Sequence, residues 1–354
     1  MAIDPSIAEP ADNNRIGSDL AQYEQMAIRG AMRSAVGWLR RPRLDRNLAF
    51  WTPWLALTPG IGLALLAGGL AVGGWPAVPL FILAAVTLPM FAVQLVMALA
   101  VSSTCPPPAC PECQAPDSPW QPYTEERGLL EHGEELWVAQ QPLTFVGMPF
   151  GTRCTVIRVG EDLLVHSPME LTPKLRHQVQ ALGRVRWLLA PNVLHHLYVG
   201  QWAEAFPEAE LWAAPGLAER RPDLPWTGTL QQGEQAPWAS ETLKTLVVRG
   251  HPFHMEVVLF HAPSKTLVLT DLLENLGHAP ETEPMLRAML GLFGMAGRPT
   301  PPTDFKWTIE DPAAMKRCVE RMLGWPFERI VVAHGRLVDR GAQEALRRGF
   351  AFLD

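Results

Sequence analysis

Apolar residues form one very long run in the first third of the chain and many short runs after it. From residue 47 to residue 111, a stretch of 65 residues, the chain has no Asp, Glu, Lys or Arg. A bilayer core about 30 Å thick is crossed by about 20 helical residues. The run therefore predicts two transmembrane helices, near 54–73 and 78–102, joined by the turn Gly73-Gly74-Trp75-Pro76. The alternative is a helical hairpin buried in a large soluble core.

The residues before this run indicate how the predicted hairpin is oriented. Between residues 29 and 46 there are six arginines and a single acidic residue, Asp45. Positively charged flanks stay in the cytoplasm, and two crossings return the chain to the side it left. We therefore expect an integral protein of the inner or cytoplasmic membrane with both termini cytoplasmic, and the lipid bilayer as a partner. Residues 18–40 are expected to form an amphipathic helix, either on the inner leaflet or simply solvated.

These patterns divide the chain into four parts. Residues 1–48 form a cytoplasmic N-terminal segment with the amphipathic helix, and residues 49–103 form the two transmembrane helices. Residues 104–122 form a linker rich in proline and cysteine, with Cys105, Cys110 and Cys113. The Cys110/Cys113 pair lacks the second pair that a zinc or redox site normally requires. Residues 123–354 form a separate domain large enough to bury its own core.

In the last domain, short apolar runs alternate with helical patterns, which predicts an α/β fold with sheets packed between helices. The predicted strands are 154–159, 163–166, 187–190, 210–213, 245–248, 256–261, 266–270 and 329–333. The predicted helices are 174–182, 196–205, 311–323 and 341–352, the first of them starting at Thr172-Pro173.

Histidines and one aspartate gather at the ends of the predicted strands. His195 and His196 follow the strand that ends at Ala190, Asp271 follows strand 266–270, and His334 lies at the end of strand 329–333. Imidazole and carboxylate together form a common ligand set for a first-row metal ion. The alternative is that these side chains are ordinary turn, cap and loop residues.

The segments that carry these residues resemble the metallo-β-lactamase-like superfamily, and within it the family known as domain of unknown function 4336. They are 163–168, 190–196, 256–261 with 265–271, and 332–335. The resemblance covers about residues 130–354. It implies an αββα sandwich, here preceded by the transmembrane helical hairpin, with the site at one edge of the two sheets.

Departures from the superfamily pattern change what the resemblance implies. Its first metal loop reads H-x-H-x-D-H, and two of the ligand positions are Pro191 and Val193 here. The first metal site then keeps at most His251, from the loop that also contains His254, and should hold no ion. The second site maps onto His195, His196, Asp271 and His334, which implies one divalent metal ion, zinc or iron. Asn275 is a candidate for orienting a ligand.

The net charge and the motifs that the sequence lacks narrow the range of possible functions. A net charge of −6 without a basic excess argues against nucleic acid as a partner, and no serine-nucleophile or phosphate-loop motif occurs. The apolar segment 285–295 could cover a pocket for a small-molecule or lipid-like ligand. Two classes stay open. One is a membrane-anchored, mononuclear metal-dependent hydrolase of unknown substrate, and the other is a non-catalytic, membrane-tethered binding or scaffold protein with a degenerate metal site.

Overall fold

The computed structural model describes residues 127–145, 148–149, 151–252, 254–276, 290, 295 and 297–354. Among these residues there is no helix with the length and apolar character needed to cross a bilayer. The predicted membrane hairpin, the amphipathic helix, the cysteine-containing linker and most of segment 285–295 lie outside the described residues. They stay predictions.

Two sheets form the centre of the described domain. The larger has the order β1-β2-β5-β6-β7-β8-β9, antiparallel from β1 to β6 and parallel from β6 to β9. Its strands are β1 (Arg127–Gly133), β2 (Leu136–Gln141), β5 (Thr152–Val159), β6 (Asp162–His166), β7 (Arg184–Ala190), β8 (Glu210–Ala213) and β9 (Gly228–Thr229). The smaller has the order β10-β11-β12-β13, with β12 and β13 parallel. Its strands are β10 (Leu243–Val247), β11 (Val257–His261), β12 (Thr266–Val268) and β13 (Arg329–Val331).

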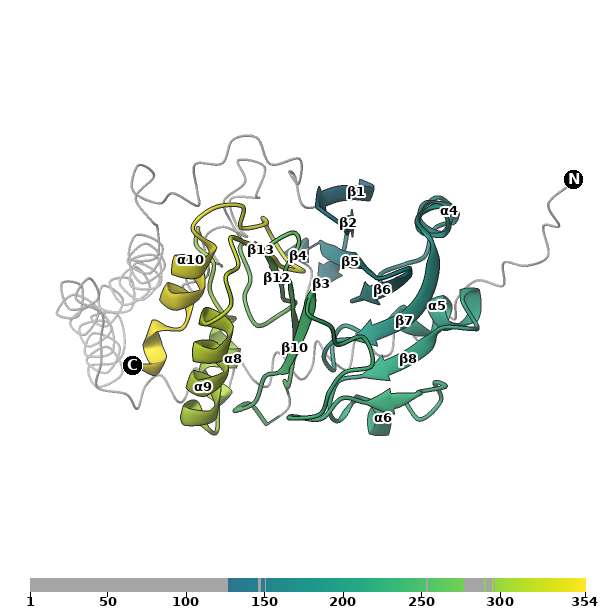
Figure 1. Cartoon of the computed structure of the whole chain (residues 1–354). Coiled ribbons are helices and arrows are strands. Elements are labelled where there is room, and N and C mark those ends of the chain that lie inside the picture. The colour runs from purple at the N-terminus through teal and green to yellow at the C-terminus, as the bar shows by residue number, and fades with distance from the viewer. Residues whose placement is uncertain are drawn as a thin grey trace, which may run out of the picture.

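Helices cover the outer faces of both sheets (Figure 1). On the side of the larger sheet lie α4 (Pro173–Leu182), α5 (Val199–Ala205) and α6 (Leu217–Arg220), and on the side of the smaller sheet lie α8 (Thr303–Thr308), α9 (Pro312–Leu323) and α10 (Ala342–Gly349). The short strands β3 (Thr144–Phe145) and β4 (Met148–Pro149) pair with each other, and the 3-10 helix η4 (Ala351–Leu353) follows α10. The domain thus has the helix–sheet–sheet–helix layers that the sequence predicts.

Alternating side chains of the larger sheet pack into two different cores. Leu164 in β6 belongs to the core that lies between the sheets and extends to α9 and α10, whereas Leu163 and Val165 belong to the core shared with α4 and α5. Both faces of the strand are therefore buried. This explains why β6 and β7 read as nearly continuous apolar runs rather than as alternating ones.

The predicted elements agree with the structure except at some boundaries and one helix start. Thr172 caps α4 by accepting a hydrogen bond from the Leu175 N–H at 3.2 Å, and Asp311 caps α9 in the same way. The helix predicted from His196 begins only at Val199. The reason is that the Asn192 side chain accepts the N–H groups of Leu194 and His195, which holds these residues in a turn. Strands β1, β2, β3, β4 and β9 and helices α6 and α8 were not predicted.

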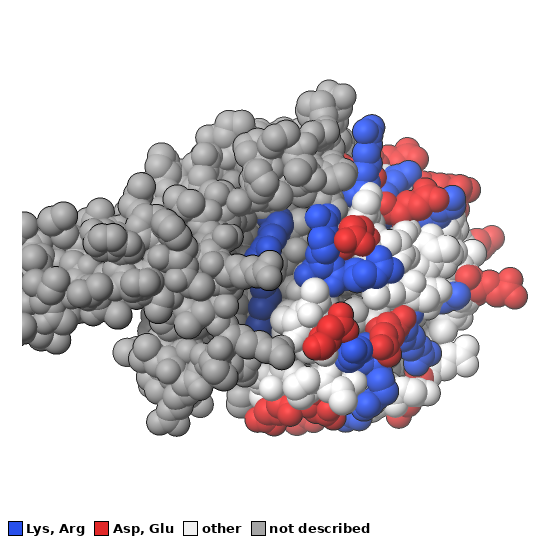
Figure 2. All heavy atoms as spheres, turned by 90° about the vertical axis from the view of Figure 1, so that its left-hand side faces the viewer, with Lys and Arg blue, Asp and Glu red and all other residues white. Residues whose placement is uncertain are grey.

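Basic and acidic side chains are interspersed on the described part of the face that carries α9 and α10 (Figure 2). Two of the ion pairs at these helices join Lys316 to Asp354 at 2.8 Å and Arg347 to Glu344 at 3.0 Å. Such exposed pairs contribute little to stability, because water and salt screen them.

Candidate metal centre

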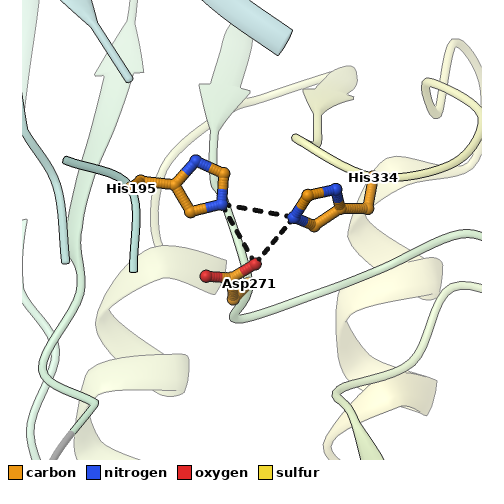
Figure 3. A group of neighbouring side chains, drawn as sticks. All are labelled: His195, Asp271 and His334. Atoms are coloured by element: carbon orange, nitrogen blue, oxygen red, sulfur yellow. Dashed lines mark hydrogen bonds and ion pairs between the residues drawn. The ribbon is translucent and has the colours of Figure 1, made fainter. Parts of the chain in front are cut away.

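Three of the four predicted ligands meet where the two sheets adjoin. His195 comes from the loop after β7 of the larger sheet, and Asp271 and His334 come from the loops after β12 and β13 of the smaller one. Asp271 Oδ1 lies 3.2 Å from His195 Nε2 and 3.1 Å from His334 Nε2, and the two imidazole nitrogens are 3.2 Å apart. Figure 3 shows the three side chains pointing toward one common centre. The parallel pairing of β12 with β13 brings Asp271 and His334 to the same edge.

The remote nitrogen of each imidazole is fixed by a hydrogen bond. His334 Nδ1 lies 2.7 Å from the carbonyl oxygen of Gly151, which can only accept, so Nδ1 carries the hydrogen. His195 Nδ1 lies 2.7 Å from Ser167 Oγ, which itself donates to the carbonyl oxygen of Arg153 at 3.1 Å. Both bonds of Ser167 are satisfied together only if His195 Nδ1 is also protonated. In the neutral rings, each Nε2 then presents a lone pair toward Asp271.

Ser167 adopts an uncommon backbone conformation at this position, with a φ of 56°. A non-glycine residue in the left-handed region costs about 1 kcal/mol or more and persists where the surroundings hold it. The buried Ser167 side chain bonds both Arg153 and His195, and these contacts aim its hydroxyl at the imidazole.

Asp271 and His334 shift each other's pKa values in opposite directions. Burial alone would raise the pKa of Asp271, but the charges and hydrogen bonds of His195 and His334 outweigh it and hold this pKa well below its usual range. Burial alone would lower the pKa of His334, but the hydrogen bond and charge of Asp271 outweigh it, and this pKa is raised. The aspartate is thus ionised, and the cluster attracts positive charge.

The loop that carries His334 is held by Asn275. The Asn275 N–H donates to the carbonyl oxygen of His334 at 3.2 Å, and its side chain donates to the carbonyl oxygen of Arg336 at 3.0 Å. Between them, Gly335 has a φ of +81°, and a Cβ there would lie 2.0 Å from the Asn275 carbonyl oxygen. Glycine is therefore required at 335. The predicted orienting role of Asn275 agrees with these contacts.

His196 does not join the group. Its side chain is fully buried on the other side of the loop, where the Arg221 guanidinium donates to His196 Nδ1 at 3.1 Å. Burial and the charge of Arg221 lower the pKa of His196 to about 3. The turn set by Asn192 sends the two neighbouring side chains in different directions, which the sequence pattern does not reveal. The structure therefore brings together three of the four predicted ligands, His195, Asp271 and His334, and places His196 apart from them.

A second cluster of metal-ligating side chains adjoins the first and shares Asp271. It consists of His254, Glu256 and Asp271, all buried, with potential ligand atoms within 4.8 Å of one another. Glu256 accepts the backbone N–H groups of residues 270, 271 and 272 at 2.7, 2.8 and 2.9 Å. Burial would raise the pKa of Glu256, but the hydrogen bond and charge of His254 outweigh it and the pKa is lowered.

His251, the residue expected to remain from the superfamily's first metal site, has a different position. Its Nδ1 accepts the His254 N–H at 2.9 Å and its Nε2 lies 2.7 Å from Thr308 Oγ1. The ring also stacks on Phe305, with centroids 4.8 Å apart and planes inclined by 9°. His254, not His251, reaches the cluster. The sequence pattern placed Glu256 only at the start of predicted strand 256–261, although a carboxylate directly before the apolar run of residues 257–260 was the available signal.

One family model matches part of the chain. Residues 133–289 match the model of a family described as a domain of unknown function, DUF4336. The match includes the loops of His195 and Asp271 and ends before His334. No curated protein matches the chain significantly.

Several solved structures are similar to the chain at low identity. A metallo-β-lactamase from Pontibacter korlensis is 15% identical, with 65% of this chain and 99% of that chain covered and a TM-score of 0.45. The metallo-β-lactamase FIM-1 from Pseudomonas aeruginosa, in a mono-zinc form, is 11% identical over 66% and 98% of the two chains, with a TM-score of 0.46. The metal-soaked Flv1 flavodiiron core from Synechocystis sp. PCC6803 is 10% identical over 65% and 60%, with a TM-score of 0.46. The described residues themselves form a mixed α/β domain with two sheets between layers of helices.

Proposed function

We propose that this chain is a metal-dependent, hydrolase-like protein that holds one divalent ion with His195, Asp271 and His334. The observation that carries the proposal is the convergence of three electron-pair donors, an ionised carboxylate oxygen and two imidazole nitrogens, at separations of 3.1–3.2 Å. Around an ion bound at about 2.0–2.1 Å, neighbouring tetrahedral ligands lie about 3.3 Å apart. Without a cation, three such donors repel one another unless a proton joins them.

The ligand set is compatible with zinc and with iron. Catalytic zinc sites combine three protein ligands with one open position, and two histidines with one carboxylate also form the common set of non-haem iron sites. A divalent ion bound here would lower the pKa of a water molecule in its open position, so that hydroxide forms near neutral pH. The substrate class stays unidentified.

Each of the three ligand residues has a defined role in this proposal. His195 and His334 present Nε2 because Ser167 and the Gly151 carbonyl engage their Nδ1–H groups. Asp271 directs Oδ1 to the imidazoles, while its Oδ2 accepts a hydrogen bond from the Asn192 amide at 2.9 Å. One carboxylate oxygen is therefore held away from the centre, which favours a single Asp271 oxygen as ligand.

The alternative is a non-catalytic binding or scaffold protein that kept the sandwich. It is favoured by the low exposure of the three ligand side chains, 8% for His195, 8% for Asp271 and 9% for His334. A substrate would have to approach through a narrow opening. Metal content together with hydrolytic turnover of generic ester, amide and phosphoester substrates distinguishes the two functions.

Membrane attachment belongs to the same proposal. Its support is the uncharged run from residue 47 to 111 and the arginine-rich flank before it. We place both termini in the cytoplasm, and the ligand is then a small or lipid-like molecule at the inner face. A C-terminal tag should resist protease added outside intact cells and be cut after the cells are opened, and cutting in intact cells would contradict this orientation.

The metal proposal is tested on the full chain purified in detergent after growth with zinc or iron. We expect about one ion per chain by inductively coupled plasma mass spectrometry, and close to none in His195→Asn. His196→Asn is the matched control, because the Asn oxygen can replace His196 Nδ1 as acceptor for Arg221, and it should keep the ion. An ion-free parent, or equal metal content in both variants, would overturn the proposal.

A further inference from the structure

The second cluster, formed by His254, Glu256 and Asp271, has a polar group at its centre. The Asn192 side-chain nitrogen lies 2.9 Å from Asp271 Oδ2, 3.3 Å from Glu256 Oε2 and 3.3 Å from His254 Nε2. It also lies 2.9 Å from the hydroxyl oxygen of Thr270. Asn192 is completely buried. One nitrogen atom thus contacts each of the three residues of the cluster.

The orientation of this amide is fixed by its other end. Asn192 Oδ1 accepts the backbone N–H groups of Leu194 at 2.8 Å and His195 at 2.9 Å. An amide oxygen only accepts and an amide nitrogen only donates, so a flipped side chain would set N–H against N–H on one side and oxygen against carboxylate on the other. The nitrogen therefore faces the cluster, and its two hydrogens point at the two acceptors 2.9 Å away.

Two carboxylates of the cluster meet at this place. Glu256 and Asp271 are two buried carboxylates, and their Oε2 and Oδ2 atoms both lie within 3.3 Å of the same nitrogen. Carboxylates this close in a buried environment repel each other strongly unless donors or a cation lie between them. His254 Nε2 is 3.5 Å from Glu256 Oε2 and 3.7 Å from Asp271 Oδ2, so it bridges them less closely than the amide does.

We propose that the Asn192 amide occupies the place of a second cation and thereby restricts the chain to one metal ion. The inference rests on the proposed metal function, because Asp271 belongs to both clusters. Its Oδ1 faces His195 and His334, and its Oδ2 faces Asn192. Replacing the amide with a carboxylate removes the two donor hydrogens and adds a ligand, so His254, Glu256, Asp271 and the new side chain form a four-ligand site.

The test is the metal content of Asn192→Asp in the full chain, measured beside the parent after growth in zinc. We expect about two ions per chain in the variant and about one in the parent. Asn192→Asp combined with His254→Ala should return to about one ion, because the double variant lacks the His254 ligand. The backbone N–H of residue 254 that bonds His251 is kept in this variant.

If Asn192→Asp does not fold, Asn192→Ala replaces it. That variant leaves three ligands around an open space, and titration with zinc should reveal a second, weaker ion that the parent lacks. One ion in the parent and one in Asn192→Asp or Asn192→Ala would overturn this inference and leave the metal function standing. No ion in the parent but one in Asn192→Asp would overturn the metal function and keep the inference, whereas no ion in either overturns both.

Discussion

The two adjoining clusters share Asp271 but balance their charge in different ways. Around His195 and His334 the donors face one another directly at 3.1–3.2 Å. Around His254 and Glu256, an amide from the chain itself separates the acceptors. A polar cluster that is satisfied internally has no need of an ion, whereas one whose lone pairs converge requires a proton or a metal. The hydrogen-bond partners, rather than the residue types alone, distinguish a ligand site from a structural network.

The largest effect is expected from Asp271→Asn, which alters both clusters. The variant should lose the ion and also lower the free energy of unfolding by about 3–5 kcal/mol, because breaking a buried charged network leaves its partners unsatisfied. Metal analysis and urea unfolding measure the two losses. Asp162→Asn is the control, since Asp162 pairs with the largely exposed Arg184 and Arg186 and should cost about 1 kcal/mol. Similar losses in both variants would remove the special role of Asp271.

Glu256→Gln tests the internally satisfied cluster. The new amide nitrogen would face at least one backbone N–H group in either orientation, so we expect a loss of about 2–3 kcal/mol in unfolding free energy. Because Glu256 holds the backbone of residues 270–272, the metal affinity of the other cluster should also fall. Urea unfolding of the metal-free protein and competition with a chelator measure these effects. Unchanged stability would show that Glu256 is not an acceptor in this network.

Ser167 offers a smaller and more selective change. Ser167→Ala removes the acceptor for His195 Nδ1 and should weaken metal binding about 10-fold to 100-fold. Ser167→Gly removes the same hydroxyl but suits the positive φ, so it should weaken binding as much while being the more stable of the two by about 1 kcal/mol. Chelator competition and thermal unfolding separate the two properties. Equal metal affinity in Ser167→Ala and the parent would exclude this orienting role.

The effect that is smallest at neutral pH concerns a histidine outside both clusters. Burial lowers the pKa of His261 to about 4, against about 6.5 in the unfolded chain. Between these values the unfolded chain binds a proton that the folded chain does not, so stability falls as the pH falls from about 6.5 to about 4. The slope for one such residue is about 1.4 kcal/mol per pH unit.

Urea unfolding of the parent and of His261→Leu at several pH values between 4.5 and 7.5 measures this slope. Below a pH of about 6.5, the unfolding free energy of the variant should fall less steeply with falling pH than that of the parent, by the slope for one residue. A parallel curve for His261→Leu would mean that His261 is not buried in its neutral form.

Much of the fold followed from the sequence, because apolar runs and capping residues are local signals. Thr172 and Asp311 marked helix starts that the structure reproduces, and the strand ends brought His195, Asp271 and His334 to one edge. The direction in which each side chain points could not be predicted from the sequence. The turn built by Asn192 turns His196 toward Arg221 and delays α5 to Val199. Such a turn depends on hydrogen bonds between residues that periodicity does not connect.

Strands β1 and β2 were missed for a related reason. Together they read Arg127–Gly133 and Leu136–Gln141, with charged and polar residues among the apolar ones. Their place is set by pairing, of β2 with β5 and of β1 with β2, rather than by their own pattern. The cluster of His254 and Glu256 was missed because its central donor, Asn192, lies more than 60 residues away along the chain.

The position of the three ligands at the junction of the sheets has a mechanical consequence. His195 belongs to the larger sheet and the other two ligands to the smaller one, and the Gly151 carbonyl that holds His334 lies directly before β5 of the larger sheet. An ion bound there would cross-link the two halves of the sandwich. Separating the halves would then release the ion, so at a free ion concentration about 100 times the dissociation constant the whole domain would gain about 2.7 kcal/mol.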